Sequence, residues 1–256
     1  MIGKLFRRRS PAPMPAGSLP AGQRIYAIGD IHGRVDLLDT LLAKIEADDA
    51  SRAPSASQII FLGDLIDRGP SSAQVVERAL QMAEGPRRCR FLLGNHEEVF
   101  LRALGGDLKA LAFFVRIGGR ETILSYAISE EDYRNSDFPE LHALLVERVP
   151  ESHRTFLESF EDLIVLGDFA FVHAGVRPGQ ALESQRVSDL RWIRHEFLDH
   201  RDGFEKIIVH GHTIFDEVEL RQHRIGLDTG AYSSGKLTAM GFEGQQRWVL
   251  DTAIEA

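Results

Sequence analysis

Six side chains suited to binding metal ions follow one another along this chain of 256 residues. They lie in five short motifs, GDIHG, GDLIDRG, GNHEE, FVHAG and VHGHT. The six residues are Asp30, His32, Asp64, Asn95, His173 and His212. A single aspartate or histidine usually belongs to a turn or a core, but chance does not readily supply five ordered motifs of carboxylate, imidazole and amide donors. The sequence therefore predicts a site for two metal ions.

The elements that must position these donors can be read from the flanking residues. Each of the first three motifs follows a short apolar run, RIYAI, QIIFL or CRFLL, which predicts a buried strand. The donors then lie just beyond the carboxyl ends of the strands, where open α/β sheets build their active sites. Gly29, Gly63 and Gly94 precede three of the donors, and a residue without a Cβ lets the backbone turn close to an ion.

Helices are expected between these strands. Apolar residues recur at helical spacing from Val35 to Ile45 and from Val75 to Leu80. Pro70 suits the start of the second helix, because its missing N–H falls where no partner exists. From Leu163 onward the pattern predicts a second sheet of short strands. Its six expected strands are LIVLG, AFVHAG, KIIVHG, RIGLD, KLTAMGF and RWVLD.

The composition excludes several classes of protein. A formal net charge of −8 argues against a nucleic-acid binder, which would carry a dominant basic face. The single cysteine, Cys89, lies within a predicted strand, which excludes both an internal disulfide and a cysteine-dependent phosphatase loop. No apolar run is long enough to span a bilayer or to form a signal peptide, so we expect a cytoplasmic protein without stable membrane insertion.

The chain is expected to contain one catalytic domain. Residues 1–23 contain three consecutive arginines and four prolines, a composition that predicts a disordered basic tail. Residues 24–256 would form the catalytic domain. Within it, the segment from about 98 to 162 reads mostly helical and is expected to form a cap beside the site.

The motifs resemble the signature of the calcineurin-like metallophosphoesterases, and within them the bacterial and phage-type serine/threonine protein phosphatases. This resemblance implies an α/β fold with a two-sheet β-sandwich core flanked by helices on both sides. It implies that Asp30, His32 and Asp64 hold one ion. Asp64 would bridge to a second ion, held also by Asn95, His173 and His212. Donors without thiolate suit two divalent ions, manganese first, with iron or zinc as alternatives.

The resemblance also implies roles for residues beside the ligands. His96, directly after Asn95, would be the general acid that protonates the leaving oxygen. Asp67 would hold the other ring nitrogen of His96, and Arg68 would clamp phosphate oxygens. Asp228 is expected to stabilise a loop, and Tyr232 is a weaker candidate for lining the substrate pocket.

Two of the assignments leave an alternative open. Arg194 resembles the second phosphate-binding arginine of the family, but Arg191 is three residues away and could fill that role. His210 and His212 point the same way on an extended segment, so either could reach a metal ion. The alignment to the family favours His212.

The implied activity is hydrolysis of phosphomonoesters, phosphoserine or phosphothreonine in proteins first, by in-line attack of a metal-bridging hydroxide. The alternative is symmetrical hydrolysis of diadenosine tetraphosphate, for which Arg34 could read a further negative charge. A phosphodiesterase is less favoured, because Ile214 stands where such relatives have a last histidine. A scaffold without catalysis is disfavoured by the presence of His96, Asp67 and Arg68. The expected partner is a phosphoprotein or a phosphorylated small molecule, and the oligomeric state stays open.

Overall fold

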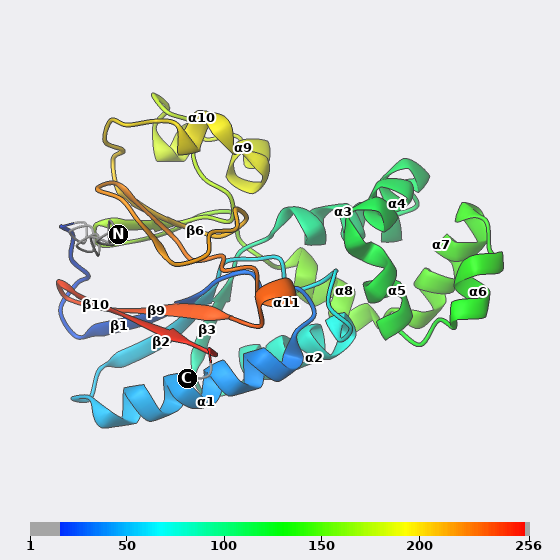
Figure 1. The fold of residues 1–256 in the computed structure, drawn as a ribbon, viewed down its shortest axis with the longest axis horizontal. Coiled ribbons are helices and arrows are strands. Elements are labelled where there is room, and N and C mark those ends of the chain that lie inside the picture. Colours follow the sequence, from blue (N-terminus) through cyan, green and yellow to red (C-terminus); the bar gives the residue numbers. More distant parts are fainter. Residues whose placement is uncertain (1–15, 254–256) are drawn as a thin grey trace, which may run out of the picture.

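The structure is a computed structural model that describes residues 16–253. The first fifteen residues of the predicted tail therefore lie outside the described residues. The rest of that tail leads into the first strand, and Leu19 is buried there. Two five-stranded sheets form the body of the molecule and lie one above the other in Figure 1. The predicted α/β sandwich with helices on both outer faces is confirmed.

The first sheet carries the three predicted parallel strands. Its strand order is β10-β9-β1-β2-β3, in which β9 pairs antiparallel with β1. The strands are β1 (Gln23–Ile28), β2 (Ala56–Phe61), β3 (Arg88–Phe91), β9 (Thr238–Glu243) and β10 (Gln246–Asp251). Because β1, β2 and β3 run parallel, the motifs that follow them meet at one edge of the sheet.

The second sheet is smaller than the sequence predicted. Its strand order is β4-β5-β6-β8-β7. The strands are β4 (Ile164–Leu166), β5 (Phe169–Phe171), β6 (Ile207–His210), β7 (Glu219–Leu220) and β8 (Arg224–Gly226). The runs KLTAMGF and RWVLD were expected here, but they form β9 and β10 of the first sheet. The prediction was wrong because an apolar run shows that a strand exists and does not show which neighbour it pairs with.

Alternating side chains of β1 separate two layers of core. Ile25 and Ala27 face the second sheet and pack with Phe171 and Phe242. Tyr26, Ile28 and further apolar residues face the outer helices. These helices are α1 (Val35–Ser51) and α2 (Ser72–Glu84), below the sheet in Figure 1. A third apolar cluster lies between the second sheet and its own helices, α9 (Val187–Trp192) and α10 (His195–Leu198).

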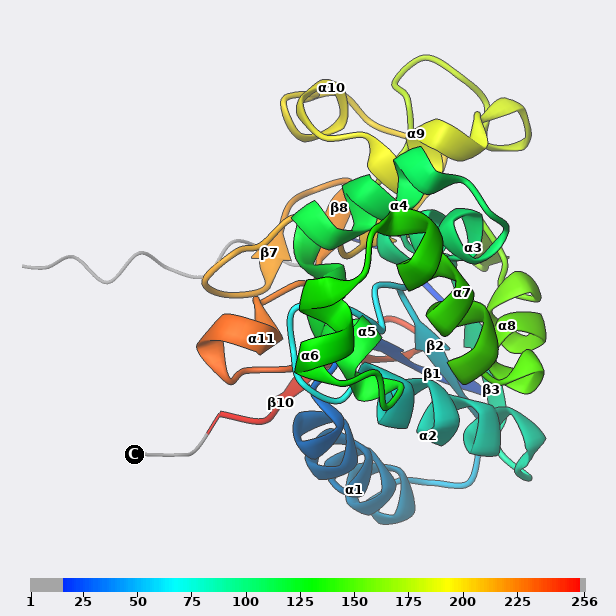
Figure 2. The ribbon, with the colours of Figure 1, turned by 90° about the vertical axis from the view of Figure 1, so that its right-hand side faces the viewer.

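Helices make up most of the segment between β3 and β4, as predicted. They stand beside the sheets at the end of the molecule that Figure 2 turns toward the viewer. They are α3 (Asn95–Leu104), α4 (Leu108–Phe114), the π-helix η1 (Val115–Gly119), α5 (Arg120–Ser125), α6 (Glu130–Asn135), α7 (Phe138–Arg148) and α8 (Glu151–Glu158). Both α5 and α8 pack against α2. We use the name inserted segment for residues 108–158, from α4 to α8.

Two smaller elements complete the fold, the 3-10 helix η2 (Leu182–Ser184) and α11 (Ala231–Ser234). The second predicted helix begins at Ser72, so Pro70 lies in the turn before it and not in its first turn. Among residues 16–253, no helix combines the length and the apolar character that crossing a membrane requires.

Candidate active site

The backbone at the carboxyl ends of the central strands is strained. In the described part of the chain, six residues other than glycine have a positive φ, and five of them lie here. They are His32, Asp64, Asp67, Arg68 and His212, with φ of 47°, 50°, 74°, 67° and 61°. Residues with a Cβ avoid this region, and such strain persists at functional sites where the surrounding contacts enforce it.

Asp64 lies at the centre of two groups of side chains that could hold metal ions. In the first group, Nε2 of His32 and Nε2 of His96 lie 3.7 and 3.9 Å from Asp64 Oδ2. In the second, Nε2 of His173 lies 3.4 Å from Oδ1, and His212 completes the group. One carboxylate thus faces both groups with different oxygens, which is the arrangement that a bridging ligand requires.

The hydrogen bonds of two histidines fix which ring nitrogen faces Asp64. Nδ1 of His32 lies 2.7 Å from the carbonyl of Ile66, and Nδ1 of His173 lies 2.8 Å from the carbonyl of Leu62. Because a carbonyl only accepts, each Nδ1 carries the proton and each Nε2 keeps a lone pair for an ion. Asn95 Oδ1 is 3.0 Å from Nε2 of His173, so the amide oxygen that was predicted to bind a metal ion lies beside the second group.

His212 and His210 have different environments. Nε2 of His212 is buried without a hydrogen-bond partner among residues 16–253, and burial together with the charge of His173 lowers its pKa to about 2. Its free lone pair belongs to the second group around Asp64. His210 is fully buried against Phe197, and its unpartnered Nε2 faces Glu219 at 4.0 Å. The structure therefore places His212 at the site and His210 in the adjoining core.

Asp30 lies beside the two groups. Both of its carboxylate oxygens accept from the backbone N–H of His212, at 3.1 and 3.0 Å. Burial and the negative charges of Asp228 and Asp64 hold the pKa of Asp30 well above its usual range. Three buried carboxylates that repel one another are stabilised by cations. With the unpartnered nitrogen of His212, they make these residues fit a dinuclear divalent metal site.

Asp228 contributes more than the loop role that the sequence suggested. Its Oδ1 does accept from the backbone N–H of Gly230 at 2.9 Å, which fixes the turn into α11. Its carboxylate is also buried, and burial together with the charge of Asp64 raises its pKa to about 6. Asp228 therefore adds to the negative potential around the ligands.

Glu97 is a functional residue that the sequence analysis missed. This fully buried carboxylate accepts from the backbone N–H groups of Asp64 at 2.9 Å and Gly94 at 3.0 Å. It also accepts from Leu65 at 2.7 Å and Ile66 at 3.2 Å. Glu97 thus joins the loop after β2 to the loop after β3 and stabilises the strained backbone of Asp64. The GNHEE motif contained the signal, but a glutamate in the first turn of a helix looks ordinary in sequence.

The predicted pair of His96 and Asp67 is present. Nδ1 of His96 lies 2.5 Å from Asp67 Oδ2, and both side chains are buried. Burial lowers the pKa of His96, but the carboxylates of Asp64 and Asp67 outweigh it and raise that pKa overall. The carboxylate of Asp67 thus fixes the ring of His96, and its Nε2 faces Arg68.

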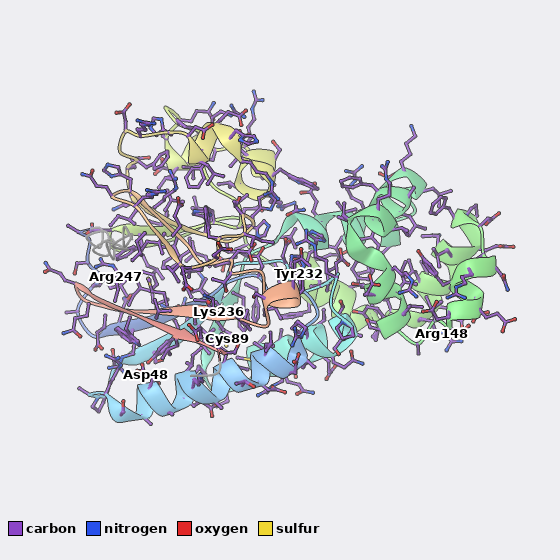
Figure 3. All side chains as sticks on the ribbon, viewed as in Figure 1. Asp48, Cys89, Arg148, Tyr232, Lys236 and Arg247 are labelled. Atoms are coloured by element: carbon purple, nitrogen blue, oxygen red, sulfur yellow. The ribbon has the colours of Figure 1, made fainter. Side chains whose placement is uncertain are left out.

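Arg68 lies between two histidines of the site. Its Nη1 is 3.0 Å from His32 Nε2 and its Nη2 is 3.1 Å from His96 Nε2. The guanidinium also lies over the ring of Tyr232, 4.9 Å from its centroid. Figure 3 places Tyr232 on α11, between the sheets and the inserted segment. Its ring meets that of His32 edge to face at 5.5 Å, so Tyr232 lines the same site.

The two candidate arginines near α9 differ in their contacts. Arg191 is paired with Asp162 at 2.7 Å and with Glu98 at 3.3 Å. Arg194 is exposed, and no carboxylate of the described residues lies within 4 Å of it. Its positive charge is one of the causes that lower the pKa of His212. Arg194 is therefore the one that remains available for an anion.

Comparisons with known proteins agree with this geometry. Residues 23–238 match the model of the calcineurin-like phosphoesterase family. Curated relatives named bis(5'-nucleosyl)-tetraphosphatase PrpE [asymmetrical] include one from Anoxybacillus flavithermus, 25% identical over 84% of this chain and 89% of the relative. One from Oceanobacillus iheyensis is 27% identical, over 86% of this chain and 88% of the relative.

Solved structures share the fold. A structure described as a putative diadenosine tetraphosphatase has a TM-score of 0.63 at 21% identity, covering 92% of this chain and 98% of the other. A metallophosphoesterase from Sphaerobacter thermophilus has a TM-score of 0.52 at 17% identity, covering 92% and 90%. With the family model spanning most of the chain, and with the ligand groups assembled around Asp64, the protein belongs to the calcineurin-like phosphoesterase family and is a metal-dependent phosphoesterase.

Proposed function

We propose that the protein hydrolyses dinucleoside tetraphosphates asymmetrically, to a nucleoside triphosphate and a nucleoside monophosphate. The reaction class rests on one observation, that Asp64 faces two groups of metal-binding side chains beside the His96–Asp67 pair. The substrate class is taken from the printed names of relatives that align with 84% or more of this chain. Symmetrical cleavage, the alternative raised by the motifs, breaks the central P–O–P bridge instead of an outer one.

The side chains of the site divide the work between them. Divalent cations bound among the ligands supply Lewis acidity toward the phosphoryl group. The fork of Arg68 orients two phosphoryl oxygens, and the exposed Arg194 can bind the following phosphate. Water adds its oxygen to the attacked phosphorus, and the bond from that phosphorus to the leaving oxygen breaks. Nε2 of His96 gives its proton to that leaving oxygen, while Asp67 holds Nδ1.

The His96–Asp67 pair favours a second candidate, hydrolysis of phosphoserine or phosphothreonine in proteins. The alkoxide of serine or threonine is a far more basic leaving group than a nucleotide phosphate. It therefore depends much more on a proton donor that is held in place. A buried imidazole that is fixed by a carboxylate at 2.5 Å suits that harder step.

One measurement separates the two candidates. The specificity constants of the full-length, manganese-loaded protein are compared for diadenosine tetraphosphate and for a phosphothreonine peptide, with a chelator-treated control. A preference for the dinucleotide supports the proposal, whereas a preference for the peptide replaces it with the phosphoprotein reading. Manganese is the ion we propose first, and titrating manganese, iron and zinc into the chelated protein ranks them.

The products then test the asymmetry. Breaking an outer P–O–P bridge of diadenosine tetraphosphate gives AMP and ATP, and breaking the central bridge gives two molecules of ADP. Chromatography of an early time point distinguishes these outcomes directly. ADP as the only nucleotide product would contradict asymmetrical cleavage and support the symmetrical alternative.

A further inference from the structure

Thr122 brings a hydroxyl group from the inserted segment to the catalytic pair. It lies in α5 and is fully buried. Its Oγ1 lies 2.6 Å from Asp67 Oδ1, and it accepts from the backbone N–H of Asp67 at 2.9 Å. Ser72, the first residue of α2, lies 2.9 Å from the same Oγ1 and also accepts from that N–H. No motif surrounds Thr122, so no role for it could be predicted from the sequence.

The direction of these hydrogen bonds follows from counting protons. Thr122 has one hydroxyl proton, and the nearest acceptor is the carboxylate of Asp67. A charged acceptor at 2.6 Å makes the stronger bond, so that proton goes to Asp67. The hydroxyl of Ser72 then donates to Thr122 Oγ1, and each group in the chain polarises the next. All the hydrogen-bonding capacity of the Thr122 hydroxyl is used.

The two oxygens of Asp67 have separate tasks. Oδ2 holds Nδ1 of His96 at 2.5 Å, and Oδ1 is held by Thr122. Asp67 is fully buried, so water cannot replace a lost donor. If the Thr122 hydroxyl were removed, Oδ1 would lack a side-chain donor and the carboxylate would rotate in search of one. The imidazole of His96 would then lose its fixed direction.

The inserted segment also holds the backbone at this point. Asp67 and Arg68 are consecutive residues in the left-handed region. Thr122 contacts the first, and the carbonyl of Gly118 accepts from the backbone N–H of the second at 3.0 Å. Gly118 has φ 116°, and a Cβ there would lie 2.8 Å from Cγ of Arg68. Two residues of the segment thus stabilise two strained residues next to His96.

We propose that Thr122 is a positioning residue for proton transfer, acting on His96 through Asp67. The inference rests on the general-acid role of His96 in the proposed function. It is independent of which phosphate compound is the natural substrate. The inserted segment then contributes to catalysis, because the hydrogen bond from Thr122 of α5 to Asp67 keeps the ring of His96 in a fixed orientation.

Ser125 provides a matched control on the same helix. Its Oγ accepts from the backbone N–H of Ala73 at 3.0 Å and donates to the carbonyl of Thr122 at 2.7 Å. It therefore anchors α5 to α2 without contacting Asp67. Loss of the Ser125 hydroxyl loosens the helix, whereas loss of the Thr122 hydroxyl also removes the bond to Asp67.

The first test compares two aryl phosphates with the full-length, manganese-loaded protein. The leaving group of phenyl phosphate is a basic phenolate, which needs a proton as it departs. The p-nitrophenolate released from p-nitrophenyl phosphate is much less basic and needs that proton far less. Thr122→Val should lower kcat for phenyl phosphate about 10-fold, with KM and bound manganese unchanged, and should lower kcat for p-nitrophenyl phosphate less than 2-fold. Thr122→Ser, which keeps the hydroxyl, should have the wild-type kcat for both substrates. Ser125→Ala should leave the ratio of the two kcat values unchanged. An equal loss on both substrates would overturn the inference.

The second test needs no turnover and applies to any substrate. In the protein loaded with diamagnetic zinc, the Nδ1 proton of His96, in its short bond to Asp67, should give a far-downfield proton NMR signal, which His96→Asn removes. Thr122→Val should shift or broaden that signal, and Thr122→Ser and Ser125→Ala should keep it. An unchanged signal in folded Thr122→Val would overturn the inference. If His96→Asn removes the signal without affecting phenyl phosphate hydrolysis, the general-acid role itself fails, and the inference falls with it.

Discussion

The two ends of β1 both bury charge, but they do so in opposite ways. At the amino end, the buried guanidinium of Arg24 donates to Asp49 at 2.8 Å, to Glu243 at 3.0 Å and to the carbonyl of Ala53 at 2.7 Å. The backbone of Arg24 is ordinary extended strand. At the carboxyl end, Asp30 and Asp64 lie among carboxylates and imidazoles, and no arginine or lysine of residues 16–253 forms an ion pair with either of them.

This difference separates a structural cluster from a functional one. Around Arg24, opposite charges and hydrogen bonds satisfy one another within the chain. Around Asp64, the carboxylates of Asp30 and Asp228 gather beside imidazoles, the backbone is left-handed, and Nε2 of His212 is buried without a partner in residues 16–253. Burial of charge alone therefore does not mark an active site. An active site is marked by backbone strain that occurs together with hydrogen-bond donors or acceptors that lack partners.

The largest effect should come from Asp64→Asn. The amide removes a negative charge that both ligand groups face, so we expect the variant to lose bound metal outright and with it all activity. Metal analysis of the purified protein measures this, and circular dichroism checks that the fold is kept. A fully metallated and active variant would show that Asp64 does not bridge two ions.

At the other end of β1, Arg24→Ala should affect stability and not chemistry. It leaves two carboxylates without their buried partner, which should lower the free energy of unfolding by about 3 kcal/mol. Urea unfolding measures the change, and activity of the folded fraction should be retained. The control is Arg78→Ala, which breaks an exposed pair with Asp39 and should cost less than about 1 kcal/mol. Equal costs for the two variants would contradict the distinction between the pairs.

His96→Asn should lower turnover of a phosphothreonine peptide or phenyl phosphate by about 100-fold or more, because general acid catalysis contributes ~10² to 10⁴. Bound metal should not change. Because His96 belongs to one of the groups around Asp64, the experiment distinguishes a proton donor from a metal ligand at this position. If metal content fell in parallel with activity, His96 would be a ligand and another group would supply the proton.

The smallest effect concerns Cys89, in β3, which should be inert. Burial raises the pKa of its thiol from 9.0 to about 11, so at pH 8 the reactive thiolate is about 100-fold scarcer than in the unfolded chain. The fold favours the protonated thiol, and this contribution to stability is lost as the pH rises from 9 toward 11. Alkylation by iodoacetamide should speed up through that range. If the native protein were alkylated at pH 8 about as fast as the protein unfolded in urea, the raised pKa of the Cys89 thiol would be refuted.

Sequence alone determined the ligand chemistry. Short apolar runs followed by glycine and a donor are local signals, so the strands β1, β2 and β3 and the places of Asp30, Asp64 and Asn95 could be predicted. The pairing of His96 with Asp67 came from resemblance to a family. The helical character of residues 98–162 was also visible, because periodicity and helix breaks are properties of neighbouring residues.

Tertiary structure decided what depends on residues far apart in the chain. It put β9 beside β1 and not in the second sheet, since a strand does not encode its partner locally. It separated His212 from His210, which the sequence had placed on one extended segment, because β6 ends at His210 and the backbone of His212 is left-handed. It also gave Glu97 and Thr122 their roles, because each acts on backbone or side-chain groups that only folding brings within hydrogen-bonding distance.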